Sequence, residues 1–152
     1  MYDEVEPTNT RIEGVTLANS AFHTVILPGG YHADRPALIR WTKIFTWRAN
    51  GDGINPFSNG LIEDCFIRTQ DDSTYVRGQA IRRVVYWQDS NGSTFVLSPL
   101  GGDSLNSHPL VVEDCTVVYA RAKVGCYLIR GPRNQKLIHL SGTTGLAGLC
   151  ST

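Results

Sequence analysis

The sequence lacks the features that mark several large classes of protein. No apolar run approaches the roughly 18 residues that a membrane-spanning helix needs, and the acidic N-terminus MYDEVEPTNT has no apolar segment of the kind found in a signal peptide. The formal net charge is zero, with 14 basic and 14 acidic residues, so no basic excess points to a nucleic acid or a membrane as partner. Charged residues make up 18% and hydrophobic residues 41% of the 152 positions, which indicates a globular chain rather than a disordered one.

Cysteine and histidine are sparse and show no metal-ligand pattern. The cysteines are Cys65, Cys115, Cys126 and Cys150, and none forms a CxxC pair. The histidines are His23, His32, His108 and His139, scattered along the chain. We therefore expect no metal site and no cofactor. Cys65 and Cys115 each end a Glu-Asp-Cys triplet inside a β-like run, which favours buried small hydrophobes over a disulfide.

A repeated element runs through most of the chain, and no amphipathic helix of useful length accompanies it. The copies are RIEGVTL (11–17), IRWTKIFTW (39–47), LIEDCFIR (61–68), AIRRVVYW (80–87) and VVEDCTVVY (111–119), with a weak sixth in KLIHLSG (136–142). Aligned on Val15, Ile44, Cys65, Val84 and Cys115, the copies are separated by 29, 21, 19 and 31 residues.

A second series follows the first with nearly the same rhythm. Its copies are HTVILPGG (23–30), GDGINPFS (51–58), DDSTYVRG (71–78), GSTFVLSP (92–99) and GCYLIRGP (125–132). Aligned on Val25, Ile54, Tyr75, Phe95 and Tyr127, they are separated by 29, 21, 20 and 32 residues. A period of about 20–30 residues with two short strands in each unit is typical of a solenoid, and Gly, Pro, Asn and Asp fill the joints, as turns require.

These rhythms predict a parallel β-helix over residues 11–142, between a polar lead-in (1–10) and an irregular tail (143–152). The five aligned residues of the first series should then form one internal ladder. The competing fold is an antiparallel β-sandwich, but only Asn91-Gly92 looks like a two-residue hairpin turn. Neither end of the repeat region resembles a cap, so we expect this chain to be a central section of a larger protein, poorly soluble or inactive when expressed alone.

The predicted coil places three aspartates, Asp52, Asp71 and Asp72, at the same corner of adjacent repeats. Asp52 lies in an Asn-Gly-Asp-Gly turn, and the pair Asp71-Asp72 follows nineteen residues later, before a Ser-Thr-Tyr-Val run. Each of these turns alone is ordinary turn chemistry. Because adjacent strands lie about 4.8 Å apart, carboxylates at the same corner of adjacent coils become neighbours, and one of them should hold a proton near neutral pH. A carboxylic acid beside carboxylates is the equipment of glycoside hydrolysis. Glu63-Asp64 and Glu113-Asp114, in the first series, are interpreted as solvated charges without a role.

The chain resembles the inverting β-helix glycosidases over about residues 11–120. The resemblance lies in an Asp-Gly pair, an Asp-Asp pair nineteen residues later, a Tyr-containing strand and a VVYW segment. The spacing is similar to that of glycoside hydrolase family 49, the dextranases and isopullulanases, and more distantly to family 28, the polygalacturonases. The resemblance implies a right-handed, single-stranded parallel β-helix of the pectate-lyase type, in a secreted enzyme that acts as a monomer outside the cell. Ser93 stands where the polygalacturonases have His, and Ser73, Thr74 and Tyr75 follow Asp71-Asp72 where dextranase-like enzymes have Gly or Ala and then Lys.

The resemblance also implies roles for the three aspartates. Asp71 matches the general acid, while Asp52 and Asp72 match the carboxylates that hold and activate the attacking water. Five further residues are candidates for substrate binding: Trp47, Asn50, Tyr75, Arg77 and Trp87. Aromatic rings stack on sugars, although burial in a core is their commoner use, and arginines bind hydroxyl or carboxylate groups.

The leading hypothesis is therefore an inverting hydrolase of an α-glucan such as dextran or pullulan, with the polysaccharide as its partner. One alternative is a β-helix without catalytic activity, either a carbohydrate-binding or adhesin-like solenoid or an inactive fragment of an enzyme. Others are a pectin-type polygalacturonase and a polysaccharide lyase, which would need a basic proton acceptor and often calcium.

Overall fold

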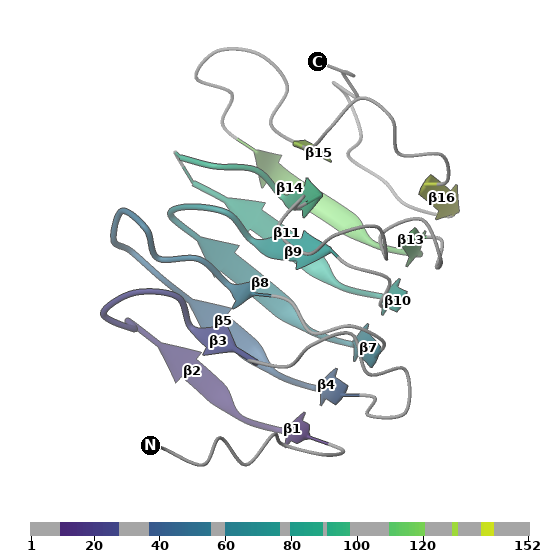
Figure 1. The fold of residues 1–152 in the computed structure, drawn as a ribbon, viewed down its shortest axis with the longest axis horizontal. Helices are drawn as coiled ribbons and strands as arrows, with labels where there is room; N and C mark the ends of the chain where they lie inside the picture. The colour runs from purple at the N-terminus through teal and green to yellow at the C-terminus, as the bar shows by residue number, and fades with distance from the viewer. Residues whose placement is uncertain are drawn as a thin grey trace, which may run out of the picture.

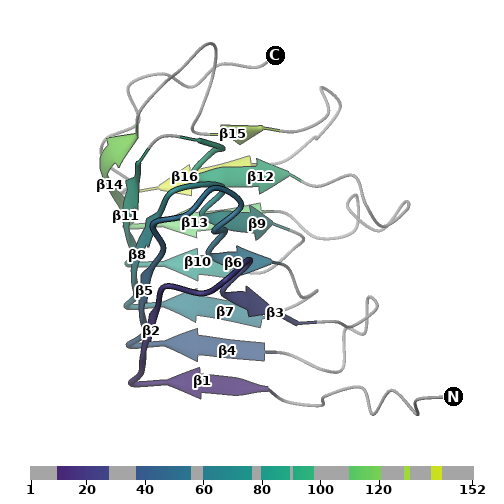
Figure 2. The ribbon, with the colours of Figure 1, turned by 90° about the vertical axis from the view of Figure 1, so that its left-hand side faces the viewer.

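The computed structural model describes residues 10–27, 37–55, 60–76, 80–89, 91–97, 110–120, 129–130 and 138–141. Within these ranges the chain is all-β, with no helix, and its strands form three parallel sheets (Figures 1 and 2). Every pairing between the described strands is parallel, so the prediction of parallel strands is confirmed and the antiparallel β-sandwich is wrong. No described segment forms a helix with the length and apolarity to cross a membrane.

Each sheet takes every third strand of the chain. Sheet A contains β1 (Arg11–Glu13), β4 (Ala37–Arg40), β7 (Gly60–Glu63), β10 (Ala80–Arg82), β13 (Leu110–Glu113) and β16 (Ile138–Ser141). Sheet B contains β2 (Thr16–Ala18), β5 (Lys43–Phe45), β8 (Phe66–Thr69), β11 (Val85–Gln88) and β14 (Thr116–Ala120). Sheet C contains β3 (Val25–Ile26), β6 (Ile54–Asn55), β9 (Thr74–Val76), β12 (Phe95–Leu97) and β15 (Ile129–Arg130). In Figure 2 the strands of sheet A follow one another from bottom to top in chain order.

Each repeat thus contributes three strands, one to each sheet, and not the two that the sequence suggested. The first series of repeats was interpreted as one strand per copy, but two residues at its centre turn the chain from sheet A into sheet B. The first of these two residues has a left-handed backbone in five successive repeats: Gly14 (φ 68°), Trp41 (53°), Asp64 (52°), Arg83 (49°) and Asp114 (52°). Side chains usually avoid this conformation, so the corner is imposed by the pairing of the flanking strands. The weak sixth copy, KLIHLSG, does contain a strand of sheet A, β16.

The interior is built of apolar ladders that run across the parallel strands. In sheet A the register places Ile12, Ile39, Ile62, Ile81 and Val112 side by side, and the last four are completely buried. In sheet B it places Leu17, Ile44, Ile67, Tyr86 and Val117 side by side. Removing these apolar surfaces from water stabilises the stack by about 25 cal/mol for each Å² buried.

The predicted internal ladder is correct for three of its five residues. Cys65, Val84 and Cys115 occupy the inward-facing second position of the two-residue corner. The residue level with them in the second repeat is Thr42, not Ile44, since Ile44 pairs with Ile67. The sequence alignment was wrong here because it assumed an apolar residue at every inward-facing position. Thr42 can occupy this position because its buried hydroxyl donates to the carbonyl of Arg40 at 3.0 Å.

The first repeat departs from the predicted ladder in a different way. Val15 is 40% exposed, because β1 and β2, the strands on either side of it, lie at one end of sheets A and B. In the second series, Ile54 and Phe95 both pair with Thr74, so Tyr75 is one residue out of the predicted alignment and Tyr127 lies outside the described residues.

Cys65 and Cys115 are both buried, as the sequence predicted, while Cys126 and Cys150 lie outside the described residues. Burial raises the pKa of the Cys65 thiol to about 11, and it raises the pKa of Cys115 as well. Both thiols therefore stay protonated and pack as small hydrophobes.

Candidate active site

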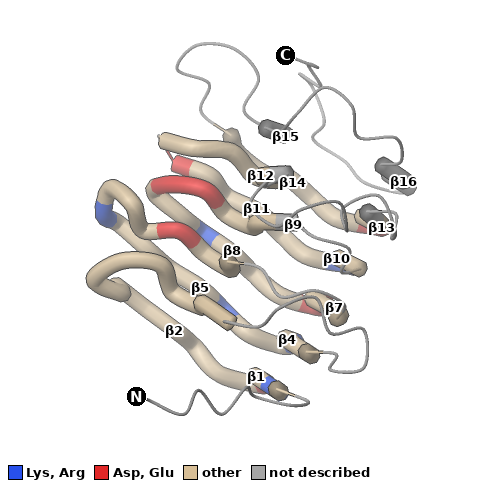
Figure 3. Tube along the Cα trace, in the orientation of Figure 1, with Lys and Arg blue, Asp and Glu red and all other residues tan. Residues whose placement is uncertain are grey.

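Three successive connections from sheet B to sheet C bring the acidic side chains together. They follow β5, β8 and β11, and Figure 3 shows acidic positions in red along them. Each begins with a polar side chain that is completely buried: Thr46, Thr69 or Gln88. These residues lie at equivalent positions, since Thr69 pairs with Gln88 and Phe45 pairs with Arg68.

These buried side chains hold the connections by hydrogen bonds to carbonyl groups further along the chain. The hydroxyl of Thr46 donates to the carbonyl of Gly51, and that of Thr69 donates to the carbonyl of Asp71 at 2.7 Å. The amide of Gln88 donates in the same way to the carbonyl of Asn91. One internal polar column therefore fixes the backbone of all three connections.

The register of sheet C then aligns four polar residues. Val25, Ile54, Thr74 and Phe95 pair in sequence, and the residues two positions earlier are His23, Asp52, Asp72 and Ser93. Backbone hydrogen bonds extend the pairing toward this row, from Thr24 N to Asp52 O (2.9 Å), from Gly53 N to Asp72 O (2.9 Å) and from Ser73 N to Ser93 O (2.8 Å). The two aspartates of the row are 2% and 3% exposed.

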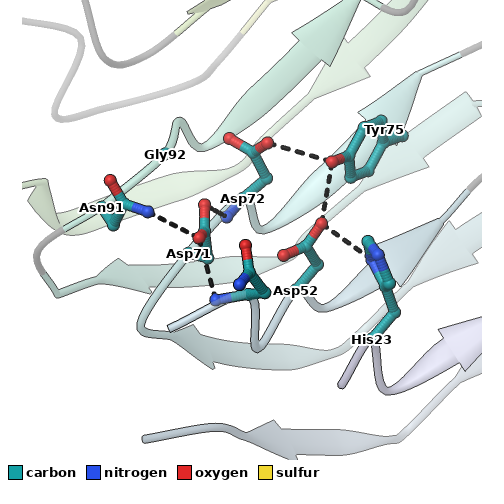
Figure 4. A pocket seen from close by; sticks show the side chains of 8 residues that line it. His23, Asp52, Asp71, Asp72, Tyr75, Asn91 and Gly92 are labelled. Carbon is teal, nitrogen blue, oxygen red and sulfur yellow. Dashed lines mark hydrogen bonds and ion pairs between the residues drawn. The ribbon is translucent and has the colours of Figure 1, made fainter. Parts of the chain in front are cut away.

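A pocket of about 330 Å³ opens over this row (Figure 4). It is lined by His23, Asn50, Asp52, Asp71, Asp72, Tyr75, Asn91 and Gly92. All three predicted aspartates are therefore in one pocket, together with two of the predicted substrate-binding residues, Asn50 and Tyr75. Among the described residues no three His, Cys, Asp or Glu side chains are placed to hold a metal ion.

Asp71 accepts three hydrogen bonds from nitrogen donors. Its Oδ2 accepts from the backbone N–H of Asn50 at 3.0 Å and from the side-chain amide of Asn91 at 2.6 Å, and its Oδ1 accepts from the backbone N–H of Asp72 at 2.9 Å. The three donors come from three different connections. They hold the carboxyl group in one orientation at the pocket wall.

Asp52 and Asp72 are joined through one hydroxyl group. Tyr75 Oη lies 2.8 Å from Asp52 Oδ2 and 3.1 Å from Asp72 Oδ2, and Asp72 Oδ1 accepts from the backbone N–H of Ser93 at 2.7 Å. A phenol has one proton to donate. When Tyr75 donates to one carboxylate, its contact with the other is a good hydrogen bond only if that carboxyl group itself carries a proton.

The pKa values in this bridge follow from burial and from the charges around it. Burial raises the pKa of Asp52 above its ordinary value, and the charges of Asp71 and Asp72 add to the rise. The hydrogen bond from Tyr75 and the charge of His23 act in the opposite direction but do not cancel it. Burial also raises the pKa of Tyr75, followed by its hydrogen bond to Asp52, so the phenol remains a proton donor over the ordinary pH range.

Three lining residues were not predicted as site residues: His23, Asn91 and Gly92. His23 Nδ1 lies 2.8 Å from Asp52 Oδ2, although the N–H direction is not aligned for a regular hydrogen bond. The signal for His23 was present in the sequence, since it stands two residues before Val25 just as Asp52 stands two residues before Ile54. It was treated instead as one of four scattered histidines.

Asn91-Gly92, which the sequence analysis singled out only as the one hairpin-like signal for the competing sandwich fold, forms part of the pocket. Gly92 has a φ of 73°, and a Cβ atom added to it would lie against the backbone nitrogen of Asp72 and 2.5 Å from the Oδ1 atoms of Asp71 and Asp72. Only glycine lets the backbone approach two carboxylates this closely.

The remaining predicted substrate-binding residues are not among the residues that line the pocket. Trp47, in the connection after β5, is 51% exposed and stacks on Phe45 with ring centroids 6.0 Å apart. Trp87 donates its indole N–H to Asp89 at 2.8 Å, and the Arg68 guanidinium lies 5.1 Å above its ring. Arg77 lies outside the described residues. Substrate binding by these three residues remains a prediction.

Comparisons of the chain with protein-family models, with curated proteins and with solved structures found no match.

Proposed function

We propose that this protein is a glycoside hydrolase that cleaves α-glycosidic bonds of an α-glucan with inversion at the anomeric carbon. The observation that carries the proposal is the pocket in which carboxyl groups from adjacent repeats face one another, two of them within hydrogen-bonding distance of one tyrosine hydroxyl. The fold that suits it is a right-handed, single-stranded parallel β-helix, supported by the three parallel sheets and by their strictly periodic strand order.

The chemistry needs one acid and one base on opposite sides of the scissile bond. In the proposed mechanism Asp71 donates a proton to the leaving oxygen, while Asp52 and Asp72 hold the attacking water and remove its proton. The nitrogen donors around Asp71 fix the position of its carboxyl group. When the Asp71 carboxyl group is protonated, its O–H donates to the glycosidic oxygen of the substrate.

The Tyr75 hydroxyl keeps the two base carboxyls together. Because Asp52 has a raised pKa, the Asp52–Asp72 pair readily holds one proton between its two members, and the remaining charge acts as the base. Loss of this arrangement should lower kcat by on the order of 10²–10⁴-fold, which is the usual contribution of a positioned acid or base.

The resemblance to dextranases and isopullulanases supports an α-glucan as substrate, met outside the cell by a monomeric enzyme. The test is the release of reducing sugar from dextran, pullulan, mutan and polygalacturonate by the intact protein. Release of reducing sugar from an α-glucan supports the proposal. Release from polygalacturonate alone would show that the enzyme is a polygalacturonase. An unsaturated product that absorbs in the ultraviolet would identify a lyase.

The acid and the base can be distinguished by the leaving group. A substrate whose leaving group needs no protonation, such as a glycosyl fluoride, should be hydrolysed by Asp71→Asn at close to the wild-type rate. Asp52→Asn should remain slow with the same substrate, because the water still needs a base. The reverse result would exchange the two roles. Unchanged hydrolysis by all three Asp→Asn variants would mean that the catalytic groups lie elsewhere. If the wild-type protein binds one of these polysaccharides but hydrolyses none of them, it is a carbohydrate-binding β-helix and not an enzyme.

A further inference from the structure

His23 contacts the most deeply buried of the three carboxyl groups. Its Nδ1 atom lies 2.8 Å from Oδ2 of Asp52, the same oxygen that accepts from Tyr75. The side chain of Asp52 is 3% exposed and that of His23 is 14% exposed. His23 is therefore the more solvent-accessible partner in a pair whose other member is almost enclosed.

The segment that carries His23 is held firmly against the next repeat. Ser20 Oγ donates to the carbonyl of Phe22 at 2.7 Å and lies 2.9 Å from Thr24 Oγ1. The backbone N–H of Thr24 donates to the carbonyl of Asp52. The ring of His23 also packs edge-on against Phe22, with centroids 4.0 Å apart. Figure 4 shows the imidazole pointing toward Asp52.

The proposed hydrolysis leaves a proton in an enclosed place. As the water oxygen bonds to the anomeric carbon and the glycosidic bond breaks, Asp71 gives its proton to the leaving oxygen and the base takes a proton from water. No net proton is consumed, but the base must lose its proton and Asp71 must regain one before the next turnover. Asp52 and Asp72 expose only 2% and 3% of their surfaces, so transfer to a more exposed neighbouring group gives the proton a route to the solvent.

The other groups that face Asp52 are poor carriers. Tyr75 contacts the same oxygen, but its raised pKa keeps the phenol protonated, and the second carboxyl group that its hydroxyl contacts, that of Asp72, is equally enclosed. Asp71 and Asp72 are acidic neighbours that raise the pKa of Asp52. Imidazole is the side chain whose ordinary pKa allows it to accept and release protons near neutral pH.

We propose that His23 is the proton relay of this site: it accepts the proton that Asp52 removes from water and passes it to the solvent. The inference rests on the proposed function and adds to it a residue that the three-aspartate mechanism does not include. His23 is a positioning and relay residue, since it acts on the reacting atoms through Asp52.

Two substitutions separate proton transfer from simple positioning. In His23→Asn the side-chain amide nitrogen can occupy the place of Nδ1 and donate to Asp52, but it cannot carry a proton away. In His23→Ala the contact with Asp52 is lost and a space remains. The relay predicts that kcat falls by at least about tenfold in both variants, within the roughly 10²–10⁴-fold contributed by acid–base groups, with KM nearly unchanged. Added imidazole should restore kcat in His23→Ala. A wild-type kcat for His23→Asn, or no restoration by imidazole, would overturn the relay.

A second measurement does not depend on turnover. In the wild-type protein the NMR signals of the His23 ring should respond to the titration of Asp52, and this response should disappear in Asp52→Asn. A His23 signal that is indifferent to Asp52 would overturn the relay even if the enzyme is active. Absence of hydrolysis by the wild-type protein on every polysaccharide would instead overturn the proposed function, while the link between His23 and Asp52 could still be read from these spectra.

Discussion

Asp52 and Asp72, twenty residues apart in the chain, share the hydroxyl group of Tyr75 at 2.8 and 3.1 Å. The contact exists because Ile54 and Thr74 pair in sheet C, which brings the residues two positions earlier side by side. One oxygen of each carboxyl group is thus directed at the same proton.

Replacement of Tyr75 by Phe should separate the roles of the ring and of the hydroxyl group. The ring stays, but the two buried carboxyl groups lose their common donor. We therefore expect kcat to fall by about tenfold or more and the free energy of unfolding to fall by about 1–3 kcal/mol. Tyr119→Phe is the matched control, because Tyr119 is 41% exposed and is not among the pocket residues. Equal activities of the two variants would mean that the bridge has no catalytic role.

Asp52→Asn should stabilise the folded protein at neutral pH while it lowers kcat. The pKa of Asp52 is raised in the folded state, so the folded protein binds more protons than the unfolded chain between the ordinary value of about 3.9 and the raised value. Stability of the wild type therefore falls as the pH rises through that window. The melting temperature of Asp52→Asn should exceed that of the wild type at neutral pH, and the difference should vanish below the ordinary pKa. A variant that is less stable than the wild type at pH 7 would contradict the raised pKa.

Gly92→Ala should damage the pocket without removing any charge. The added Cβ would collide with the backbone of Asp72 and with both neighbouring carboxyl groups, and we expect a loss of activity of 10²-fold or more, of the order that a displacement of about 1 Å produces. Gly14→Ala is the control. Gly14 also has a positive φ, 68°, but nothing lies within 4 Å of its added Cβ, so this variant should lose only about 1 kcal/mol of stability and remain active.

Thr69→Val should test the internal polar column beneath the pocket. The substitution removes the hydrogen bonds of the Thr69 hydroxyl to the carbonyl of Asp71 and to Ser73 Oγ, and it leaves buried partners unsatisfied at a cost of about 1–3 kcal/mol in the free energy of unfolding. Denaturant unfolding measures this loss. We also expect kcat to fall more than KM rises, because the backbone of Asp71 is released. A variant with unchanged stability would show that the column does not hold the connection.

The sequence predicted the parallel strands and the three aspartates because both follow from spacing alone. Repeats of nearly constant length stack their equivalent residues, so Asp52 and Asp72 had to become neighbours once the period was recognised. The finer register was harder to predict, since polar residues such as Thr42 and Thr74 are buried with hydrogen bonds that only the folded chain reveals. Alignment on apolar residues alone therefore slipped by two positions at Ile44 and by one at Tyr75.

His23 and Gly92 escaped prediction for a related reason. His23 is a candidate site residue only because the next repeat places the carboxyl group of Asp52 2.8 Å from its ring. Gly92 gains meaning only from the two carboxyl groups against which its backbone lies. In both cases the partner is 20 or more residues away in the chain, and the contact depends on a register that the sequence did not determine to the residue.

The stereochemistry of the first-formed product tests the central claim most directly. Proton NMR during hydrolysis of an α-linked glucan by the intact protein should show the β-anomer first, because in the proposed mechanism Asp52 and Asp72 direct water to the face opposite Asp71. Asp71→Asn should hydrolyse the same substrate more slowly by on the order of 10²–10⁴-fold, while Glu63→Gln and Asp64→Asn, which contact Arg83 on the surface, should be nearly silent. A first-formed α-anomer, or near-normal hydrolysis by Asp71→Asn, would contradict the account.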